Sequence, residues 1–259
     1  MEILEVGGLR LGVTDAGAGA PVLMLHPFPL DGTVLDAQVD LLARERRVLR
    51  VDFPGFGNSP PPAGPVSIEG YARALREVFA KKKISRADGL GMSLGSYALI
   101  ELSRQAPMFF ERLVLVSSRA TPASPEARLD RETMAKRAEV EGVGWIAGSW
   151  GPLLLRPDPE LAALRTVEKI INRATPQGVA AGARALASRG DQSAAAKAIA
   201  AKTLVLHGGE DRITPLGEAT LLAQLIPQSS LEVIPGAGHV VHLDEPDRFD
   251  RAVVSFLSA

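Results

Sequence analysis

Short runs of apolar residues recur along this chain, and helical patterns separate them. Runs of this length, with few polar residues inside them, are typical of strands that are buried on both faces of a parallel sheet. The four clearest runs are 22–25, 48–51, 113–116 and 203–206. The helical patterns cover 35–45, 67–82, 94–105, 216–225 and 246–257. This alternation predicts an α/β fold with a doubly wound, mostly parallel sheet.

The beginning of the chain departs from this alternation. Two β-rich stretches, 2–6 and 9–15, flank Gly7-Gly8, which predicts a hairpin and an antiparallel entry into the sheet. Residues 85–90 fit a strand poorly, because they have little β-propensity and Asp88 would be costly to bury without a partner. The alternation nevertheless requires a strand at this position.

A long segment without strand patterns lies between the runs that end near Ser117 and begin near Thr203. It spans about 80 residues, which is too many for a simple crossover. Its helical patterns cover 125–141, 144–154, 158–173 and 177–189. We therefore expect a core formed by residues 1–118 and 200–259, interrupted by a helical cap at residues 119–199.

Composition excludes several classes of partner and cofactor. With 29 basic and 30 acidic residues, the chain has no large field of one sign to attract nucleic acid or an anionic membrane, so we expect small-molecule partners. The absence of cysteine rules out disulfides and thiolate chemistry, and four histidines offer few metal ligands, so we expect no metal and no cofactor. No signal peptide or long apolar stretch is present, which favours a cytoplasmic protein. The lysines at 81–83 are interpreted as a solvated helix end.

A G-x-S-x-G pentapeptide, Gly91-Met92-Ser93-Leu94-Gly95, stands between the required strand and a helical pattern. A sharp strand-to-helix turn projects a serine hydroxyl only if the positions two before and two after can approach neighbouring backbone, which favours glycine. The pentapeptide alone is a weak signal, since serine is also a common helix cap and the chain has 25 glycines. Its value depends on whether a base and an acid accompany it.

A serine hydroxyl needs an imidazole to accept its proton and a carboxylate to orient that imidazole. His239 and Asp211 both follow apolar strand patterns, so both should emerge at the carboxyl edge of the sheet, where α/β sites form. Glu210 is a rival acid and His242 a rival base. The end of the strand at 113–116 offers only Ser117-Ser118, which cannot serve as the acid. His207 and His26 are interpreted as packing and loop-holding residues.

The order Ser93, Asp211, His239 resembles that of the α/β-hydrolase superfamily. The segment 25–31, Leu-His-Pro-Phe-Pro-Leu-Asp, is similar to the oxyanion loop of that family, and 52–59 is similar to its following G-x-G-x-S turn. The resemblance implies an eight-stranded sheet with an inserted cap, a Ser-His-Asp triad, and an oxyanion hole formed by the backbone N–H groups of Phe28 and Leu94. Proline replaces the usual glycine at position 27, but the implied donor is the next residue.

A serine nucleophile argues against the dehalogenase and epoxide hydrolase branches, which need a carboxylate, and favours hydrolysis of small carboxylic esters or lactones. Residues 175–181 resemble the corresponding region of 3-oxoadipate enol-lactonases, whereas Pro29 is similar to a proline of cofactor-free haloperoxidases, or perhydrolases. Arg119 or a cap arginine would suit a substrate carboxylate. Trp145 and Trp150 either line the pocket or pack within the cap. A non-catalytic receptor or regulatory partner on the same scaffold is the alternative from another class.

Overall fold

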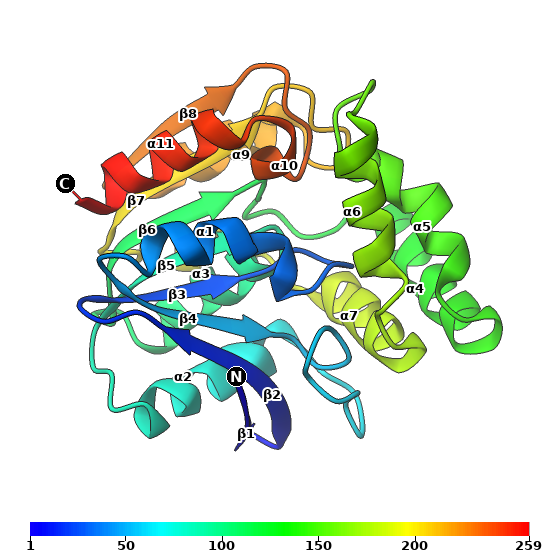
Figure 1. The fold of residues 1–259 in the computed structure, drawn as a ribbon, viewed down its shortest axis with the longest axis horizontal. Coiled ribbons are helices and arrows are strands. Elements are labelled where there is room, and N and C mark those ends of the chain that lie inside the picture. The colour runs from blue at the N-terminus through cyan, green and yellow to red at the C-terminus, as the bar shows by residue number, and fades with distance from the viewer. Residues whose placement is uncertain (259) are drawn as a thin grey trace.

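The computed structural model describes residues 1–258 and contains one eight-stranded sheet in the order β1-β2-β4-β3-β5-β6-β7-β8 (Figure 1). The first two strands form an antiparallel hairpin, β2 pairs antiparallel with β4, and all other pairs are parallel. The strands are β1 (Glu2–Val6), β2 (Leu9–Ala16), β3 (Pro21–Leu25), β4 (Arg47–Asp52), β5 (Ala87–Met92), β6 (Phe110–Val116), β7 (Lys202–Gly208) and β8 (Ser229–Ile234). The predicted doubly wound sheet and its hairpin entry are confirmed.

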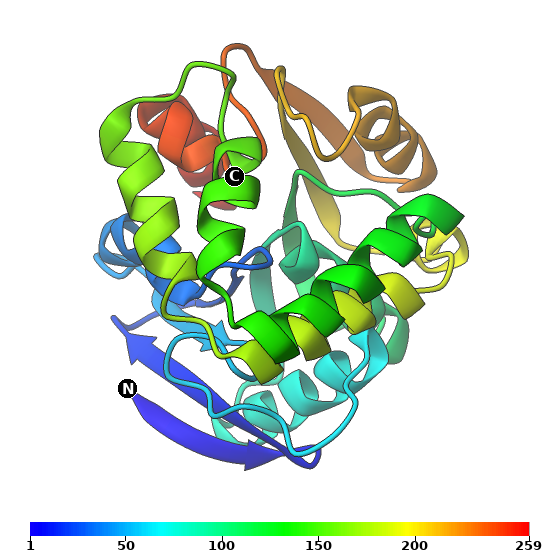
Figure 2. The same ribbon diagram turned by 90° about the vertical axis from the view of Figure 1, so that its right-hand side faces the viewer.

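Helices cover both faces of the sheet (Figure 2). One face carries α1 (Asp36–Leu42), which follows the short 3-10 turn η1 (Gly32–Leu35), and α11 (Pro246–Ser258). The other carries α2 (Ile68–Lys81), α3 (Leu94–Gln105) and α9 (Leu216–Leu225). The short helix α10 (Val241–Asp244) precedes α11. No helix within residues 1–258 combines the length and apolar character that crossing a membrane requires.

The strand that the sequence only weakly supported, β5, is fully buried at the centre of the sheet. Its low β-propensity has a packing reason, because a Cβ on Gly89 would lie 2.9 Å from a methyl carbon of Leu113 on the next strand. Asp88 is buried but not unpartnered. Its carboxylate accepts the backbone N–H of Arg112 at 2.9 Å and forms an ion pair with Arg46. The local pattern was weak because tertiary contacts, not propensity, determine this strand.

The segment between β6 and β7 folds as a helical insertion beside the carboxyl edge of the parallel strands (Figure 1). It contains α4 (Pro125–Glu141), α5 (Gly144–Trp150), the 3-10 turn η2 (Gly151–Leu154), α6 (Leu161–Ile171), α7 (Pro176–Ser188) and α8 (Ser193–Lys197). Ser124 and Thr175 cap α4 and α7 by accepting backbone N–H groups, each with a proline at the next position. A proline thus occupies the first position of each of these two helices.

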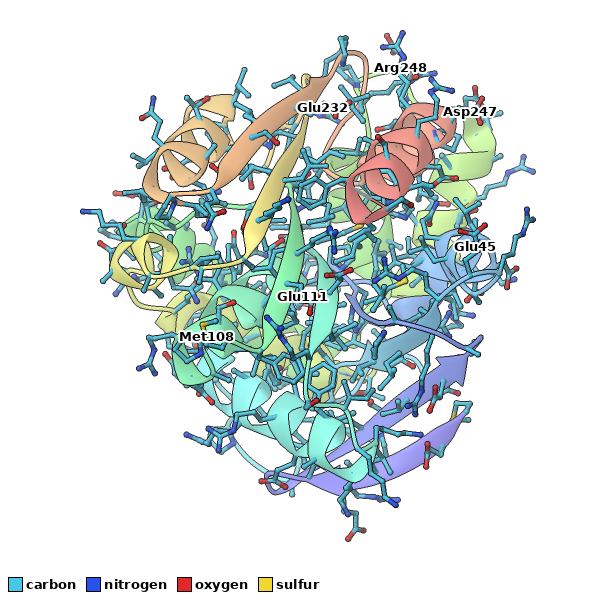
Figure 3. The ribbon with its side chains drawn as sticks, turned by 90° about the vertical axis from the view of Figure 1, so that its left-hand side faces the viewer. Glu45, Met108, Glu111, Glu232, Asp247 and Arg248 are labelled. Carbon is cyan, nitrogen blue, oxygen red and sulfur yellow. The ribbon has the colours of Figure 1, made fainter. Side chains whose placement is uncertain are left out.

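Among residues 1–258, the opposite end of the sheet carries no comparable insertion (Figure 3). There the exposed side chains of Glu45 and Glu111 lie on the amino-terminal side of the strands. The helical insertion is therefore confined to the sheet edge at which the sequence places Ser93, Asp211 and His239. The division into a core and a cap at residues 118–119 and 199–200 stays a prediction.

Candidate active site

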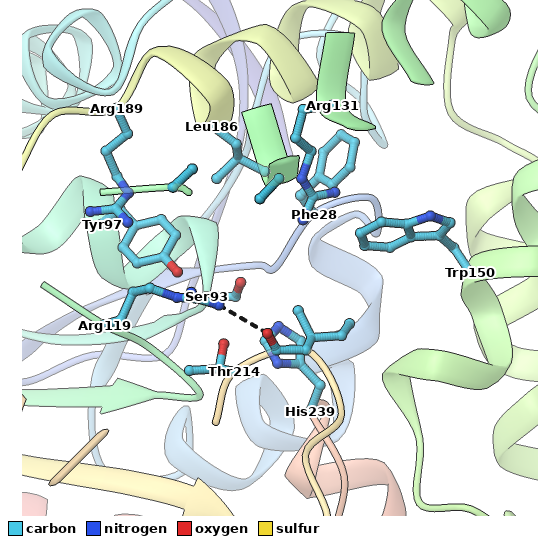
Figure 4. A pocket seen from close by; sticks show the side chains of 13 residues that line it. Phe28, Ser93, Tyr97, Arg119, Arg131, Trp150, Leu186, Arg189, Thr214 and His239 are labelled. Atoms are coloured by element: carbon cyan, nitrogen blue, oxygen red, sulfur yellow. Dashed lines mark hydrogen bonds between the residues drawn. The ribbon is translucent and has the colours of Figure 1, made fainter. Parts of the chain in front are cut away.

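A small cavity lies between the carboxyl edge of the sheet and the helical insertion (Figure 4). Its volume is about 70 Å³, less than half of the roughly 150 Å³ that holds benzene in an engineered protein core. It is lined by Phe28, Ser93, Tyr97, Arg119, Ala123, Ala127, Arg131, Trp150, Leu186, Arg189, Ile213, Thr214 and His239. We call this the Ser93 cavity. Five of the residues that the sequence singled out for chemistry or binding meet here: Phe28, Ser93, Arg119, Trp150 and His239.

Ser93 occupies a strained turn between β5 and α3. Its backbone has φ 49° and ψ −107°, in the left-handed half of dihedral space that side chains rarely adopt. A Cβ on Gly91 would lie 2.6 Å from the carbonyl carbon of Gly95, and one on Gly95 would lie 2.5 Å from the carbonyl oxygen of Leu25. Both glycines therefore have the steric role that the pentapeptide predicts, and Ser93 faces the cavity.

His239 and Asp211 form a hydrogen-bonded pair beside this turn. His239 Nδ1 lies 2.8 Å from Asp211 Oδ2, and both side chains are buried. Asp211 Oδ1 accepts the backbone N–H groups of Ile213 at 2.8 Å and Thr214 at 3.0 Å. Burial alone would raise the pKa of Asp211, but His239 and these two donors hold that pKa below its usual value. The carboxylate is thus ionised at neutral pH and fixes the imidazole orientation.

The hydroxyl of Ser93 makes no hydrogen bond to His239 within residues 1–258, although both residues line the same cavity. Such bonds are often long in the absence of substrate. The dashed line in Figure 4 marks a different contact, from Arg119 to the carbonyl oxygen of Ile213 at 2.9 Å. Glu210, the rival acid, is exposed.

Ser117 supports the histidine loop from the end of β6. It has a positive φ of 50°, and its hydroxyl donates to the carbonyl oxygen of His239 at 2.7 Å. The sequence argument considered this position only as an alternative acid site and so missed its contact with the histidine. The one feature of the sequence that could have indicated this contact is the position of Ser117 at the end of the strand beside β7.

The loop after β3 is held by His26. The backbone N–H of Phe53 donates to His26 Nε2 at 2.9 Å, and Nδ1 lies 3.0 Å from the carbonyl oxygen of Pro27. Burial lowers the pKa of His26, so the ring is neutral. These contacts agree with the predicted loop-holding role. Within residues 1–258, the N–H groups of Phe28 and Leu94 donate to no protein acceptor, which leaves both free for a ligand.

The two tryptophans of the helical insertion have different surroundings. Trp150 lines the Ser93 cavity, whereas Trp145 does not; its ring packs against Arg137, with the guanidinium 4.0 Å from the ring centroid. Five helical positions turn the side chain by about 140°, so both cannot face the same cavity. Sequence reasoning named Arg119 but missed Tyr97, Arg131 and Arg189. The pattern predicted the helix that carries Arg131 but not which of its faces meets the cavity.

The remaining histidines lie outside the Ser93 cavity. His207 is buried, with Nε2 4.0 Å from Asp211 Oδ2. His242, the rival base, is buried against Phe249, and its Nε2 donates to the carbonyl oxygen of Val34 at 2.8 Å. A packing role for both agrees with the sequence argument. Among residues 1–258, no cluster of three or more histidine or carboxylate side chains is placed to hold a metal ion.

His242 gives the fold a predictable sensitivity to acid. Burial lowers its pKa to about 4, whereas an unfolded chain has the ordinary value of about 6.5. Between these values the unfolded state binds more protons, so the free energy of unfolding falls as pH falls from about 6.5 to 4, by at most about 3 kcal/mol from this group. We expect His242→Gln to flatten that slope in urea titrations at several pH values. An unchanged slope would contradict this assignment.

A family model described as "Alpha/beta hydrolase family" matches residues 22–252. The chain belongs to this family. A thermophilic esterase from Thermogutta terrifontis, solved with malate bound, superimposes with a TM-score of 0.93 at 32% identity, over 100% of this chain and 98% of that one. The enol-lactonase from Burkholderia xenovorans LB400 has a TM-score of 0.92 at 27% identity, covering 100% of both chains.

A curated relative, the pimeloyl-[acyl-carrier protein] methyl ester esterase of Nitrosomonas europaea, is 28% identical over 92% of this chain and 95% of its own length. A bromoperoxidase from Bacillus anthracis shares the fold, with a TM-score of 0.86 at 20% identity, over 97% of this chain and 96% of that one. The resemblance to hydrolases with esterase, enol-lactonase and haloperoxidase branches is confirmed. The roles of individual residues stay predictions.

Proposed function

We propose that this chain hydrolyses small carboxylic esters or lactones through an acyl-enzyme on Ser93. The observation that carries the proposal is the His239–Asp211 pair, joined at 2.8 Å, in the same small cavity as a serine on a strained strand-to-helix turn. The esterase and enol-lactonase relatives support the reaction class.

Acylation begins when Ser93 Oγ attacks the substrate carbonyl carbon and its proton passes to His239 Nε2. The imidazolium that forms is stabilised by Asp211, whose low pKa keeps it ionised. Collapse of the tetrahedral intermediate breaks the bond to the leaving oxygen, which takes the proton from Nε2. For a lactone, the leaving alcohol stays attached to the acyl group.

Deacylation repeats these steps with water as the nucleophile. His239 takes a proton from the water, whose oxygen attacks the acyl carbon, and then returns that proton to Ser93 Oγ as the carboxylic acid leaves. If hydrogen peroxide replaced water at this stage, the product would be a peracid. The perhydrolase alternative therefore differs in the second nucleophile and not in the acyl-enzyme.

The oxyanion is assigned to the free N–H groups of Phe28 and Leu94. Leu94 is the first residue of α3, so the helix dipole adds to its N–H. Donors fixed before the reaction stabilise developing charge without reorganising, and losing one costs about 3 kcal/mol of transition-state stabilisation. The buried loop around His26 holds the Phe28 donor in place.

The test combines an acyl-length series with covalent labelling. We expect acetate and butyrate esters to be hydrolysed faster than octanoate esters, because the cavity is small. Diethyl p-nitrophenyl phosphate should add one diethylphosphoryl group, found by mass spectrometry on Ser93. Stoichiometric ligand binding without ester turnover or labelling would reject the proposal and favour the receptor alternative.

A further inference from the structure

One cation in the Ser93 cavity has no partner. Arg131, on α4, lines the cavity with its guanidinium 4.2 Å from the ring centroid of Trp150 and 5.3 Å from that of Phe28. Its Nη1 is shielded from solvent and has no hydrogen-bond partner, and the side chain forms no ion pair with any residue in the range 1–258. Arg131 as a whole is half-buried, but a buried guanidinium nitrogen without a hydrogen-bond partner is costly, which favours a ligand at this position.

The other two arginines of the cavity are already engaged. Arg119 donates to the carbonyl oxygen of Ile213, and Arg189 donates to carbonyl oxygens, including those of Ala120 and Thr121. Only Arg131 is therefore free to bind a substrate without losing a contact within the fold.

The cavity as a whole is electropositive. None of its thirteen lining residues is an aspartate or a glutamate, whereas three are arginines. Burial first, and then repulsion from Arg119, lowers the pKa of Arg131 to about 10, so it stays charged at neutral pH. A cavity with this balance of charge favours an anionic ligand and disfavours a cationic one.

We propose that Arg131 binds a carboxylate of the substrate, so that the ester or lactone cleaved at Ser93 carries an anionic group. The proposal rests on the proposed function for the position of the scissile bond. The Phe28 and Trp150 rings hold the guanidinium, and its N–H edge can donate two parallel hydrogen bonds to a carboxylate. The monoester of a short dicarboxylic acid is a substrate of this class.

Matched esters test the charge requirement. In the first pair, monomethyl glutarate has a carboxylate on its acyl part where methyl glutaramate has a neutral amide of the same shape. In the second pair, acetoxyacetate has a carboxylate on its alcohol part where acetoxyacetamide has the neutral amide. We expect kcat/KM to be at least about tenfold higher for the anionic member of one pair. In Arg131→Gln the ratio of kcat/KM for the anionic ester to kcat/KM for the neutral one should fall by about tenfold to a hundredfold. In Arg131→Lys this ratio should lie between those of the Gln variant and the unchanged protein.

Arg137→Gln is the matched control, because Arg137 lies on the same helix and also packs on a tryptophan, but outside the cavity. Its ratio of anionic to neutral kcat/KM should equal that of the unchanged protein. If neither pair shows a preference for the anion, or if Arg131→Gln and Arg131→Lys both keep the preference, the proposal is overturned while hydrolysis at Ser93 stands.

A binding measurement separates this proposal from the proposed function. Calorimetric titration of Ser93→Ala protein with glutarate should show binding, and adding Arg131→Gln should weaken it at least about tenfold. Should no ester be turned over by the unchanged protein, the proposed function fails, but this titration still reports on Arg131. Equal glutarate affinity with and without Arg131 would reject the carboxylate site.

Discussion

Replacing Ser93 with alanine is expected to lower kcat for acetate esters by roughly 10⁵-fold. The reason is that Ser93 Oγ forms the covalent bond of the proposed acyl-enzyme, and no other group in the cavity can take its place. Tyr97 and Thr214 are the other hydroxyls that line the cavity, and within residues 1–258 no imidazole is hydrogen-bonded to either hydroxyl. The variant should also resist labelling by diethyl p-nitrophenyl phosphate.

The substitution should leave the fold intact, because it removes one oxygen and keeps the Cβ. Thermal unfolding checks this point. Ser103→Ala is the matched control, since Ser103 lies on the same helix, α3, and its hydroxyl donates to the carbonyl oxygen of Leu99 within that helix. It should retain activity. Substantial ester hydrolysis by Ser93→Ala would show that a different nucleophile operates.

The sheet was predictable because most of its central strands are short apolar runs in the sequence. Val22, Leu113 and Val205 lie in short apolar runs that only burial on both faces explains, and all three are fully buried. The strand β5 has no such apolar run, because Gly89 and Gly91 allow close packing and Asp88 forms an ion pair. Contacts between distant segments cannot be read from local propensity.

The catalytic candidates were predictable for a different reason. Ser93, Asp211 and His239 each follow a strand, so topology alone brings them to one edge of the sheet. The cavity walls were not predictable, because they depend on which faces of α4 and α5 meet that edge. Trp145 and Trp150 were equal candidates from sequence, and Arg131 was indistinguishable from the other arginines of its helix.

Replacing Asp211 with asparagine is expected to lower kcat by about 10⁴-fold while leaving KM nearly unchanged. The structure gives the reason. Asp211 Oδ1 accepts the N–H groups of Ile213 and Thr214, and Oδ2 accepts from His239. Asparagine has only one acceptor oxygen. If that oxygen serves the two backbone donors, its amide group faces His239 Nδ1 and forces the proton onto Nε2, which then cannot accept the proton of Ser93.

The opposite orientation of the amide leaves two backbone N–H groups without an acceptor, at a cost of about 1–3 kcal/mol each, so the inactive arrangement should prevail. Glu210→Gln is the matched control, because Glu210 precedes Asp211 but is exposed, and it should keep full activity. Steady-state kinetics with a short-chain ester and thermal unfolding of both variants distinguish the two carboxylates. Loss of activity in Glu210→Gln, with Asp211→Asn unaffected, would transfer the orienting role to Glu210 and remove the main support for the proposed mechanism.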